Sequence, residues 1–465
     1  MMFIARHGLK FKLYTYFKRH LFCSTIKHAN KSYRRKYLSR MSLYLPKTLK
    51  EEGLKCTSQD LFLYNEVLFP SHTGAYCYLP LGLRALEKLI RLIDEEMQAI
   101  GAQKIAMPSM VRSSLWKKTG RWDTPELFKL KDRHSKEYCL GPTHEELVTD
   151  MVSQYGNIPH RRLPIMLYQI TKKFRDEMHP KYALLRGREF EMKDLYTFDT
   201  DEDTAKETYS MVCDSYCTIF DRLKLDYVKV EGSTGNIGGK LSHEFHLPAT
   251  IGEDSLYLCN KCGYGSNEEL IDAEDLLKNH VTCPKCKAEM THAPGIEVGH
   301  AFLLGTKYSK VFKTNYIDAL QKKRLTEMGC YGLGVSRILQ ASVEVLCQDR
   351  KIRWPSLIAP YQVCIIPQME GYGSEEFNRL SDELSDVLTS LPNLRNEVVI
   401  EDRIKSTVGK RIHQADAQGY PHVIVVGRKC LEEPRLYEVI DMVAGHKEFM
   451  TQEQIVDKFR HIETI

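Results

Sequence analysis

Apolar and polar residues alternate along two segments that flank a polar stretch, and together they predict a β-hairpin. The first segment, residues 163–170, is apolar and rich in β-branched and aromatic residues, which is typical of a strand. The second, residues 188–198, alternates with a period of two, so every second side chain lies on one face. That face carries Arg188, Phe190, Met192, Asp194 and Tyr196.

The predicted hairpin is unusually charged for the wall of a sheet. Arg175 and Glu177 share a face at the end of the first strand and add to the arginine and the carboxylate of the second. Unpaired charges are costly inside a sheet. Guanidinium groups bind phosphate, an aromatic ring stacks on a base, and a carboxylate orients an amine. The face therefore indicates a nucleotide site, and an exposed hairpin with solvated charges is the alternative.

A glycine-rich segment, residues 329–336, precedes a helical pattern that extends to about Leu346. We interpret the segment as a turn whose glycines let the backbone approach a ligand, while the helix N-terminus favours an anion. Arg337 falls in the first turn of that helix, where it is expected to face the same anion.

Helical and strand periodicities predict the rest of the organisation. Residues 82–101 and 201–223 carry apolar residues at helical spacing. Beyond Pro360, short apolar strands alternate with helical patterns, which predicts a small α/β domain with a largely parallel sheet. The strands are expected at 363–366, 398–400 and 423–426, and the helices at 377–388 and 408–418.

Composition places the chain among globular proteins with two or three domains, since its 465 residues are 43% hydrophobic and 27% charged. No run of about 18 apolar residues occurs, so we expect no membrane-spanning helix. The 14 cysteines are scattered without the spacing of a small disulfide scaffold. We therefore expect mostly reduced thiols in a reducing compartment.

The formal net charge of +5 hides a strong asymmetry. Residues 1–40 hold six Lys, five Arg and no acidic residue, a charge of +11, so the remainder carries +5 − 11 = −6. An Arg-rich, acid-free segment is typical of a mitochondrial presequence. The alternative is a basic tail that binds RNA electrostatically.

Three sequence motifs resemble those of class II aminoacyl-tRNA synthetases. FRDE at 174–177 with REF at 188–190 resembles motif 2, and GLGVSR at 332–337 resembles motif 3. IGAQKIAMPSM at 100–110, a helix end and a strand carrying Pro108, resembles motif 1. Other segments are similar to bacterial-type prolyl-tRNA synthetases, above all the short mitochondrial form, from about Ser42 onwards: GAYCYLPLGLR, LGPTHEE, REFEMKDLYTF, SHEF, EVGHAFLLGTKYS and MGCYGLGVSR.

The resemblance implies an α+β catalytic domain, built on an antiparallel sheet with flanking helices, over residues 41–353. A linker at 354–360 and an α/β anticodon-binding domain at 361–465 would follow. It also implies a homodimer whose interface includes residues 82–101 and the strand bearing Pro108. The implied activity is ligation of L-proline to tRNA(Pro) in the mitochondrial matrix, through a prolyl-adenylate made from ATP with Mg²⁺.

Roles for individual residues follow from the resemblance. Arg175 would neutralise the α-phosphate and Arg337 would hold the γ-phosphate, as the two catalytic residues. Glu177 would fix the adenine amine and Phe190 would stack on the base, with Arg188 as a further ATP contact. The residues implied for proline binding are Thr143, Glu145, Met192, Asp194, Tyr196, His300, Phe302 and Cys330.

Several of these residues have ordinary alternative roles. Thr143 and Glu146 have the spacing of a helix capping box, a role compatible with proline binding by Thr143 and Glu145. Residues 297–309 resemble the strand beside the substrate. From the residues alone, Phe302, His300 and Cys330 would be core residues.

Residues 252–294 stand where bacterial relatives carry a large editing domain, and they are too few to form one. The resemblance then implies an enzyme that does not clear mischarged alanine in cis. The segment contains Cys259-x-x-Cys262 and Cys283-x-x-Cys286, the spacing of a four-thiolate structural Zn²⁺ site, with a relic loop as the alternative.

Three charged residues of the C-terminal domain have two possible roles. By resemblance Asp402, Arg403 and Lys410 fall where the C-terminal domain meets the anticodon, and each is otherwise a solvated surface charge.

For the whole chain, the alternatives are a related synthetase with another amino acid and a catalytically inactive synthetase-like subunit that binds RNA or a polymerase. An inactive protein is expected to have lost phosphate-binding arginines, whereas Arg175 and Arg337 are present.

Overall fold

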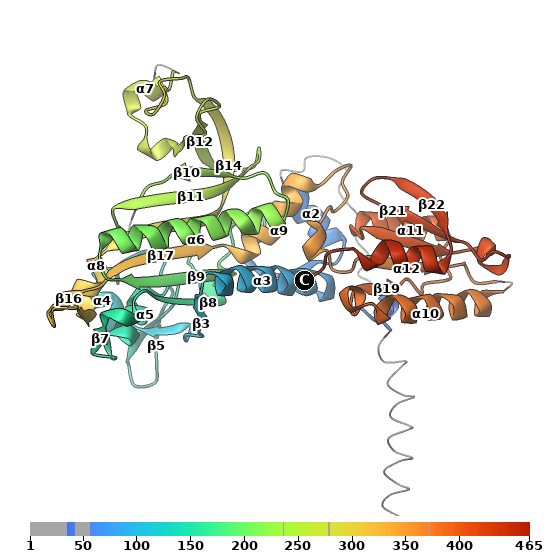
Figure 1. The fold of residues 1–465 in the computed structure, drawn as a ribbon, viewed down its shortest axis with the longest axis horizontal. Coiled ribbons are helices and arrows are strands. Elements are labelled where there is room, and N and C mark those ends of the chain that lie inside the picture. The colour runs from blue at the N-terminus through green and yellow to red at the C-terminus, as the bar shows by residue number, and fades with distance from the viewer. Residues whose placement is uncertain (1–34, 42–55, 236, 278–279, 372) are drawn as a thin grey trace, which may run out of the picture. The chain divides into compact units, whose positions relative to one another are not determined.

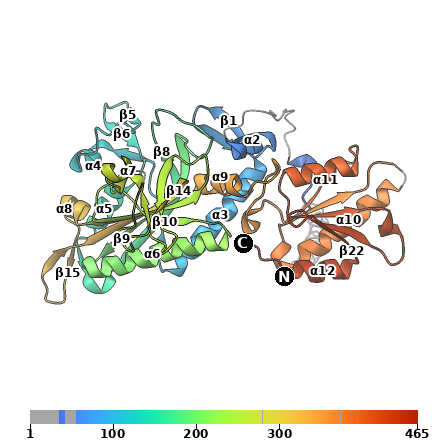
Figure 2. The ribbon, with the colours of Figure 1, turned by 90° about the horizontal axis from the view of Figure 1, so that it is seen from above.

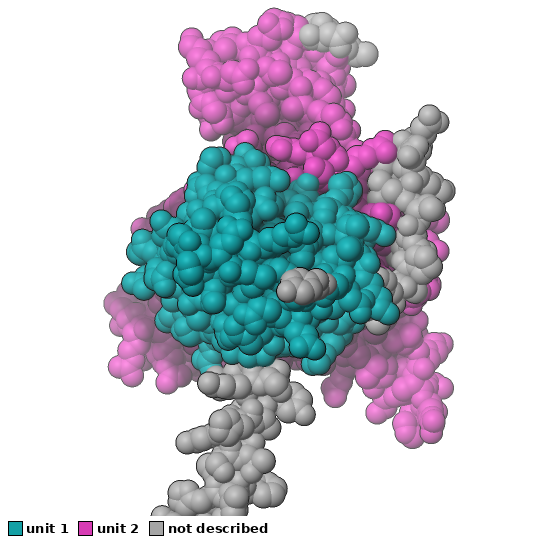
Figure 3. All heavy atoms as spheres, turned by 90° about the vertical axis from the view of Figure 1, so that its right-hand side faces the viewer, with its two compact units in different colours: residues 1–44, 361–464 teal, residues 45–360, 465 magenta. Residues whose placement is uncertain are grey.

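The chain forms two compact units, coloured separately in Figure 3. Unit 1 combines residues 1–44 with 361–464, and unit 2 contains residues 45–360 and 465. The C-terminal part of unit 1 begins at residue 361. In the computed structural model the described residues are 35–41, 56–235, 237–277, 280–371 and 373–465.

Unit 2 is built on a nine-stranded sheet that is antiparallel except at two pairings, β10 with β13 and β3 with β8. β11 also pairs with β14. The predicted antiparallel sheet is therefore confirmed. Its strands, in spatial order, are β11 (Leu241–Pro248), β10 (Val228–Glu231), β13 (Gly265–Asn267), β12 (Asp254–Leu258), β14 (Thr291–Gly305), β17 (Glu327–Leu333), β9 (Glu189–Asp199), β8 (Ile165–Phe174) and β3 (Gln103–Lys104).

Helices cover one face of this sheet. α6 (Glu202–Arg222) lies along it, beside α3 (Pro80–Ala99) and α9 (Val335–Leu346) (Figures 1 and 2). α6 begins with a capping box, in which Asp201 accepts the Thr204 N–H. Its apolar side chains recur at helical spacing and pack with those of α3 and α9 in one core, as the periodicity predicts.

A second core lies on the opposite face. Successive residues of the central strands pack into different cores: Leu195 and Tyr331 pack in the first, while Tyr196 and Cys330 pack in the second. This alternation follows from the period of two along a strand. The remaining elements of unit 2 are α2 (Thr57–Tyr64), β1 (Leu68–His72), β2 (Ala75–Tyr78), β4 (Met110–Arg112), α4 (Ser113–Lys118), β5 (Lys129–Lys131), β6 (Glu137–Leu140), α5 (Glu145–Ser153), β7 (Asn157–Pro159), α7 (Ala273–Leu277), α8 (Lys307–Phe312), β15 (Asn315–Ile317) and β16 (Lys323–Leu325).

Unit 1 has a five-stranded sheet with helices around it (Figure 1). Three strands are parallel and the last two are antiparallel, so the prediction of a largely parallel sheet holds for its first part. The predicted strands and helices are present, whereas β21, β22 and α12 were not predicted. The elements are β19 (Val398–Ile400), β18 (Val363–Pro367), β20 (His422–Val426), β21 (Tyr437–Asp441), β22 (His446–Met450), α10 (Ser374–Ser390), α11 (Val408–Ala417) and α12 (Gln452–Arg460).

The predicted linker at 354–360 is wrong, because this segment packs in the core of unit 2. Trp354 stacks on Phe62 with ring centroids 5.4 Å apart, and Ile358 is fully buried. The buried Lys88 ammonium donates to the Ala359 carbonyl at 2.6 Å. Pro355 caps a short 3₁₀ turn here, so the prolines shape a packed segment rather than an exposed one.

The predicted presequence overlaps a folded segment at its end. Residues 1–34 lie outside the described residues, but Arg35 pairs with Asp382 at 2.5 Å and with Asp386 at 2.7 Å. Leu38 is buried, and Tyr37 bridges to Ile400 in parallel fashion. Residues 35–41 therefore belong to unit 1, and a predicted boundary at residue 40 is too late.

Three smaller predictions also need correction. Residues 329–333 are not a turn but most of β17, which pairs on both sides with β14 and β9. Pro108 lies between β3 and β4 rather than in a strand. The strand predicted at 297–309 ends at Gly305, and α8 follows it. Within the described residues, we find no helix with the length and hydropathy needed to span a bilayer.

Candidate active site

A cleft lies over the central strands of unit 2. Its floor takes Phe190, Met192 and Asp194 from β9, Phe302 from β14 and Cys330 from β17. The row of side chains predicted on one face of the hairpin thus forms part of this floor. The cleft is also lined by Thr143, Glu145, Arg175, Glu177, His300 and Arg337.

One end of the cleft is rich in arginine. Arg175 lies over the Phe190 ring, 5.2 Å from its centroid, and it forms no ion pair with any described residue. Arg337 is fixed by the backbone, because it donates to the carbonyls of Leu185 at 2.8 Å and Glu297 at 2.7 Å. A guanidinium held in place beside an unpaired one suits a ligand with several negative charges.

Carboxylates balance the charge around these arginines. Glu177 accepts from Arg186 at 3.0 Å, and Arg186 donates at 2.5 Å to Glu253. Glu297 is 3.4 Å from Arg337 and 3.0 Å from the His300 ring. Burial alone raises the pKa of Glu297, but the His300 hydrogen bond and the Arg337 charge outweigh it and hold the pKa below its usual range.

The other end of the cleft is organised around Glu145, whose side chain is fully buried. It accepts from the Thr143 hydroxyl at 2.6 Å, from the Cys330 thiol at 3.0 Å and from Arg121 at 3.2 Å. Burial alone raises the pKa of Glu145, but Arg121 and Thr143 reverse the shift and hold the pKa below its usual value. An ionised carboxylate therefore lines this end of the cleft.

The predicted capping box is wrong. α5 begins after His144 without a side-chain cap, because the Thr143 hydroxyl bonds to Glu145 instead. Glu146 accepts from Arg121 at 3.0 Å and from Thr119 at 2.8 Å. Burial raises the pKa of Glu146, and Arg121, which also pairs with Glu145, does not offset the rise. Arg121 thus serves both carboxylates.

Asp194 is held by donors beneath the floor. Its oxygens accept from Lys173 at 2.7 Å, from Gln169 at 3.0 Å and from Tyr196 at 2.9 Å. The same Tyr196 hydroxyl accepts the His144 N–H at 2.8 Å. Asp194 and Tyr196 therefore join the floor to the start of α5, and Tyr196 supports the cleft from below rather than lining it.

Two aromatic rings from β14 also line the cleft. The rings of His300 and Phe302 stack with centroids 3.8 Å apart and planes 21° apart. His300 is oriented on both ring nitrogens, by Ser242 at 2.5 Å and by Glu297 at 3.0 Å. A flat aromatic surface and a buried carboxylate in one cleft suit a small ligand with an apolar body and a cationic amine.

The structure brings eleven of the thirteen expected ATP and proline residues into this cleft. Tyr196 lies below it, and Arg188 lies outside, where it pairs with Asp176 and sits over the Phe128 ring, 4.8 Å from its centroid. Sequence reasoning missed Arg121, Gln169 and Lys173, which position the expected residues.

The residues expected at the anticodon are placed differently. In unit 1 Asp402 accepts from Ser39, with N–H and hydroxyl distances of 2.9 and 2.5 Å. Arg403 pairs with the buried Glu401. Lys410 is exposed in the first turn of α11. Two of the three expected residues are thus used in contacts within the chain.

Family models match both units. The tRNA synthetase class II core domain (G, H, P, S and T) matches residues 128–346, and the anticodon binding domain matches residues 362–462. A probable mitochondrial proline–tRNA ligase of Rattus norvegicus is 47% identical over 441 residues, which cover 92% of this chain and 91% of the relative. The chain belongs to the proline–tRNA ligase family.

A fungal relative supports the same placement in the family, and a solved structure shares the fold. A probable mitochondrial proline–tRNA ligase of Schizosaccharomyces pombe is 39% identical over 87% of this chain and 93% of its own length. The prolyl-tRNA synthetase of Cryptosporidium parvum, solved with halofuginone and AMPPNP, shares the fold with a TM-score of 0.70. That alignment covers 86% of this chain and 73% of the other at 18% identity.

The family matches include both the cleft residues and the residues expected at the anticodon. The cleft residues, from Thr143 to Arg337, fall within the class II core match, and Asp402, Arg403 and Lys410 fall within the anticodon-domain match. The class II ligase fold predicted from the motifs is therefore confirmed.

Proposed function

We propose that the cleft activates L-proline with ATP and that the chain then transfers the prolyl group to tRNA(Pro), as a class II proline–tRNA ligase. One observation carries this proposal: Arg175 and Arg337 line one end of a cleft whose other end holds the ionised Glu145. A triphosphate and a cationic amine fit these two ends, with the reacting carboxylate of proline between them.

In the first step an oxygen of the proline carboxylate attacks the α-phosphorus of ATP. The bond to the β-phosphate oxygen breaks, so prolyl-adenylate and pyrophosphate form. Arg175 neutralises charge at the α-phosphate, and Arg337 holds the γ-phosphate. Phe190 stacks on the adenine, whose amine faces Glu177. Positioning and electrostatics carry this step, and it needs no covalent intermediate with the protein.

In the second step the terminal ribose hydroxyl of tRNA(Pro) attacks the prolyl carbonyl, and AMP leaves with the bonding electrons. The hydroxyl proton must pass to a base or to solvent. The proline ring meanwhile lies against Phe302 and His300, and its amine faces Thr143 and Glu145. Cys330 and Met192 border the ring on the floor.

Mg²⁺ would neutralise the pyrophosphate as it leaves. Beside Arg175 and Arg337 a second hollow is lined by carboxylates: Glu253, Asp254, Glu269 and Glu297. Oxygen donors of this kind fit a hard divalent cation. Glu177 and Glu297 line both hollows, and we propose that these carboxylates would help to hold the ion, which would offset the charge of the phosphates.

Unit 1 would bind the anticodon of tRNA(Pro). Of Asp402, Arg403 and Lys410, only Lys410 is exposed, so we rank it first among the proposed contacts. Replacing it with alanine is expected to raise the KM for tRNA without changing pyrophosphate exchange, which needs no tRNA.

We also propose that the active form is a homodimer located in the mitochondrial matrix. Leu83 on α3 is 44% exposed, an apolar side chain on the helix expected at the interface. Light scattering after gel filtration would test the dimer. The relatives named as mitochondrial and the basic residues 1–34 support the location. Protease protection of a tagged chain in isolated mitochondria would test the matrix.

The substrate is best tested by pyrophosphate exchange with a panel of amino acids on the full chain. Exchange that depends on proline far more than on threonine, histidine or glycine would support the proposal. Exchange driven by another amino acid would assign a different substrate. A folded chain that is inactive with every amino acid would favour the alternative, an inactive subunit that binds RNA or a polymerase.

A further inference from the structure

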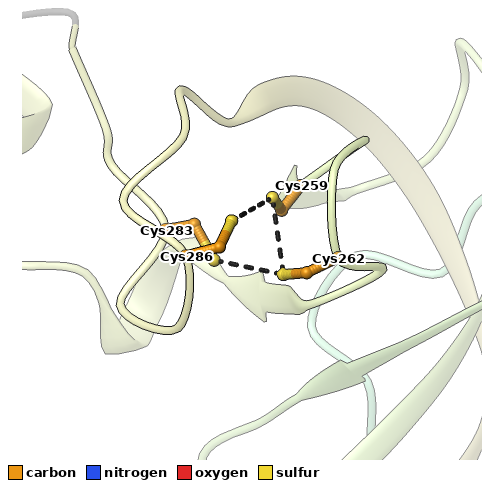
Figure 4. Close-up of side chains that lie close together, drawn as sticks. All are labelled: Cys259, Cys262, Cys283 and Cys286. Atoms are coloured by element: carbon orange, nitrogen blue, oxygen red, sulfur yellow. Dashed lines mark hydrogen bonds between the residues drawn. The ribbon is translucent and has the colours of Figure 1, made fainter.

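Four cysteine thiols converge in residues 252–294, the segment that follows β11 and leads into β14 (Figure 4). The sulfur atoms of Cys259 and Cys286 are 3.4 Å apart, those of Cys262 and Cys283 are 3.5 Å apart, and those of Cys259 and Cys262 are 3.6 Å apart. All four lie within 4.8 Å of one another. None of them lines the catalytic cleft.

The two Cys-x-x-Cys turns have the same backbone geometry. In each, the first cysteine donates its N–H to the carbonyl five residues later, and the residue four positions later donates back to the first cysteine. That fourth residue has a positive φ in both turns, +72° at Gly263 and +62° at Lys287. The bonds are Cys259 to Tyr264 (2.8 Å), Gly263 to Cys259 (2.9 Å), Cys283 to Ala288 (2.8 Å) and Lys287 to Cys283 (2.9 Å).

The sulfur spacing fits a single tetrahedral ion. Four thiolates at about 2.3 Å from Zn²⁺ lie about 3.8 Å from one another. The three spacings of 3.4 to 3.6 Å are close to this value. A disulfide instead requires sulfurs about 2.05 Å apart, and all four cysteines are free thiols. Two turns of the same geometry that present four thiols around one point form a preorganised binding site rather than a chance cluster.

We propose that Cys259, Cys262, Cys283 and Cys286 bind one Zn²⁺ as a structural site. Each thiol releases its proton to solvent as it binds. Four thiolates leave no open position for substrate or water, so the ion has no part in the ligase chemistry. An all-thiolate tetrahedral set selects Zn²⁺ or iron over the hard cations that oxygen ligands prefer.

The segment needs such an ion because it has little core of its own. Among its described residues, the hydrophobic cluster has four buried members, and two of them are cysteines of the site: Cys259, Cys283, Val281 and Met290. A unit of this size seldom folds on apolar burial alone, and metals are a common means of holding one together. Metal binding here would therefore be coupled to folding of the segment.

The proposed site also supports the catalytic sheet. Tyr264, next to the first turn, donates to Glu231 of β10 at 2.9 Å, and Asn267 donates to Glu244 of β11 at 2.9 Å. β12 ends at Leu258, just before the first turn, and pairs along the start of β14. β14 continues from there to Glu297 and His300 in the cleft. Zinc would thus fix the outer end of a strand that carries cleft residues.

The first test uses the full chain, purified without added chelator. Elemental mass spectrometry is expected to find about one zinc per chain and no comparable iron. Alkylation followed by mass spectrometry is expected to spare these four thiols until a chelator is added, and then to modify all four. Absence of metal with four reactive thiols, or thiols that react only after reduction as disulfides do, would overturn the proposal.

Variants give the second test. Cys262→Ser and Cys283→Ser are expected to lose the zinc, whereas Cys77→Ser, an exposed thiol outside the segment, is expected to keep it. Cys286→His should retain zinc, because imidazole is also a zinc ligand. Full zinc content in both serine variants would contradict the proposal. The alkylation pattern of the unmodified chain decides the question even where a variant does not fold.

Discussion

At the scale of single residues, Glu145 is the centre of the proposed proline site. A fully buried carboxylate is strongly destabilising unless charge and hydrogen bonds compensate it. Arg121, Thr143 and Cys330 supply that compensation. The carboxylate can therefore stay ionised in an apolar surrounding and attract a cationic amine.

The Glu145→Gln variant tests this role. The change removes the charge that would face the proline amine, and a hydrogen bond to a charged group is worth about 1.5–3 kcal/mol. We expect the KM for proline in pyrophosphate exchange to rise about 10- to 150-fold, with the KM for ATP unchanged. Glu95→Gln, on the exposed surface of α3, is the control. Equal losses for proline and ATP would place Glu145 outside the proline site.

The buried Lys193 predicts a pH dependence of stability. Burial lowers its pKa from 10.5 to about 7. Between these values the unfolded chain binds more protons than the native one, so this group makes the free energy of unfolding rise with pH. The rise is at most about 1.4 kcal/mol per pH unit, and below pH 7 the cost of the buried charge is fully present.

Urea unfolding of wild type and of Lys193→Met at pH 7, 8 and 9 would measure this effect. The variant should lack this part of the slope, while Lys206→Met, at an exposed lysine of α6, should keep it. The same pH dependence in wild type and Lys193→Met would show that Lys193 titrates normally.

Sequence reasoning reached most of the cleft but not its supports. Arg175, Phe190 and Arg337 belong to motifs with a chemical reason for each residue type. Arg121 belongs to no periodic or spaced pattern, so only the folded structure reveals its role. Gln169 lies in the predicted strand, but its bond to Asp194 depends on the register of the hairpin, which the pattern did not fix.

At the scale of elements, close packing explains why β17 contains glycine. A Cβ at Gly329 would lie 2.2 Å from the buried Tyr331 hydroxyl and 2.8 Å from the Thr197 hydroxyl. Gly329 is therefore required by close packing between neighbouring strands, whereas Gly332, which lines the cleft, has only the Met192 sulfur within 4 Å of a Cβ, at 3.9 Å. The prediction of a turn failed because glycine favours turns in general, whereas here the sheet encloses it on both sides.

A pair of glycine substitutions tests this packing. We expect Gly329→Ala to lower the free energy of unfolding by about 1–3 kcal/mol, the usual cost of overpacking. Gly409→Ala in α11 meets nothing within 4 Å and should change stability by about 1 kcal/mol or less, in the stabilising direction. Chemical denaturation measures both. An unchanged Gly329→Ala would mean that the strand can yield there.

The short segment at 252–294 predicts how the chain treats alanine. The methylenes that proline has and alanine lacks are worth only about 1–3 kcal/mol of discrimination in an apolar pocket. We expect detectable alanine-dependent pyrophosphate exchange and no hydrolysis of Ala-tRNA(Pro) by the chain. Hydrolysis of alanyl-tRNA by the purified chain, above the rate without protein, would reveal an editing site elsewhere.

At the scale of the whole molecule, long periodic elements were predictable and boundaries were not. Apolar spacing predicts the helices near 82–101 and 201–223 and the alternation of elements beyond Pro360. This spacing is visible in the sequence because the apolar residues are those that the fold buries. The segments at 35–41 and 354–360 resemble a basic leader and a proline-rich linker by composition. Both are packed because of tertiary contacts, such as those of Arg35 and Trp354, that composition does not encode.

We propose that one cleft in unit 2 activates proline with ATP. Proline-dependent exchange of pyrophosphate into ATP tests it most directly when wild type, Arg175→Ala and Arg222→Ala are compared. Arg222 on α6 pairs with Glu96 and does not line the cleft, so it controls for loss of an arginine. We predict exchange in wild type and Arg222→Ala, and at least a 100-fold loss in folded Arg175→Ala, or about 2.7 kcal/mol. Undiminished exchange in Arg175→Ala would show that Arg175 does not stabilise the reacting phosphate in this cleft.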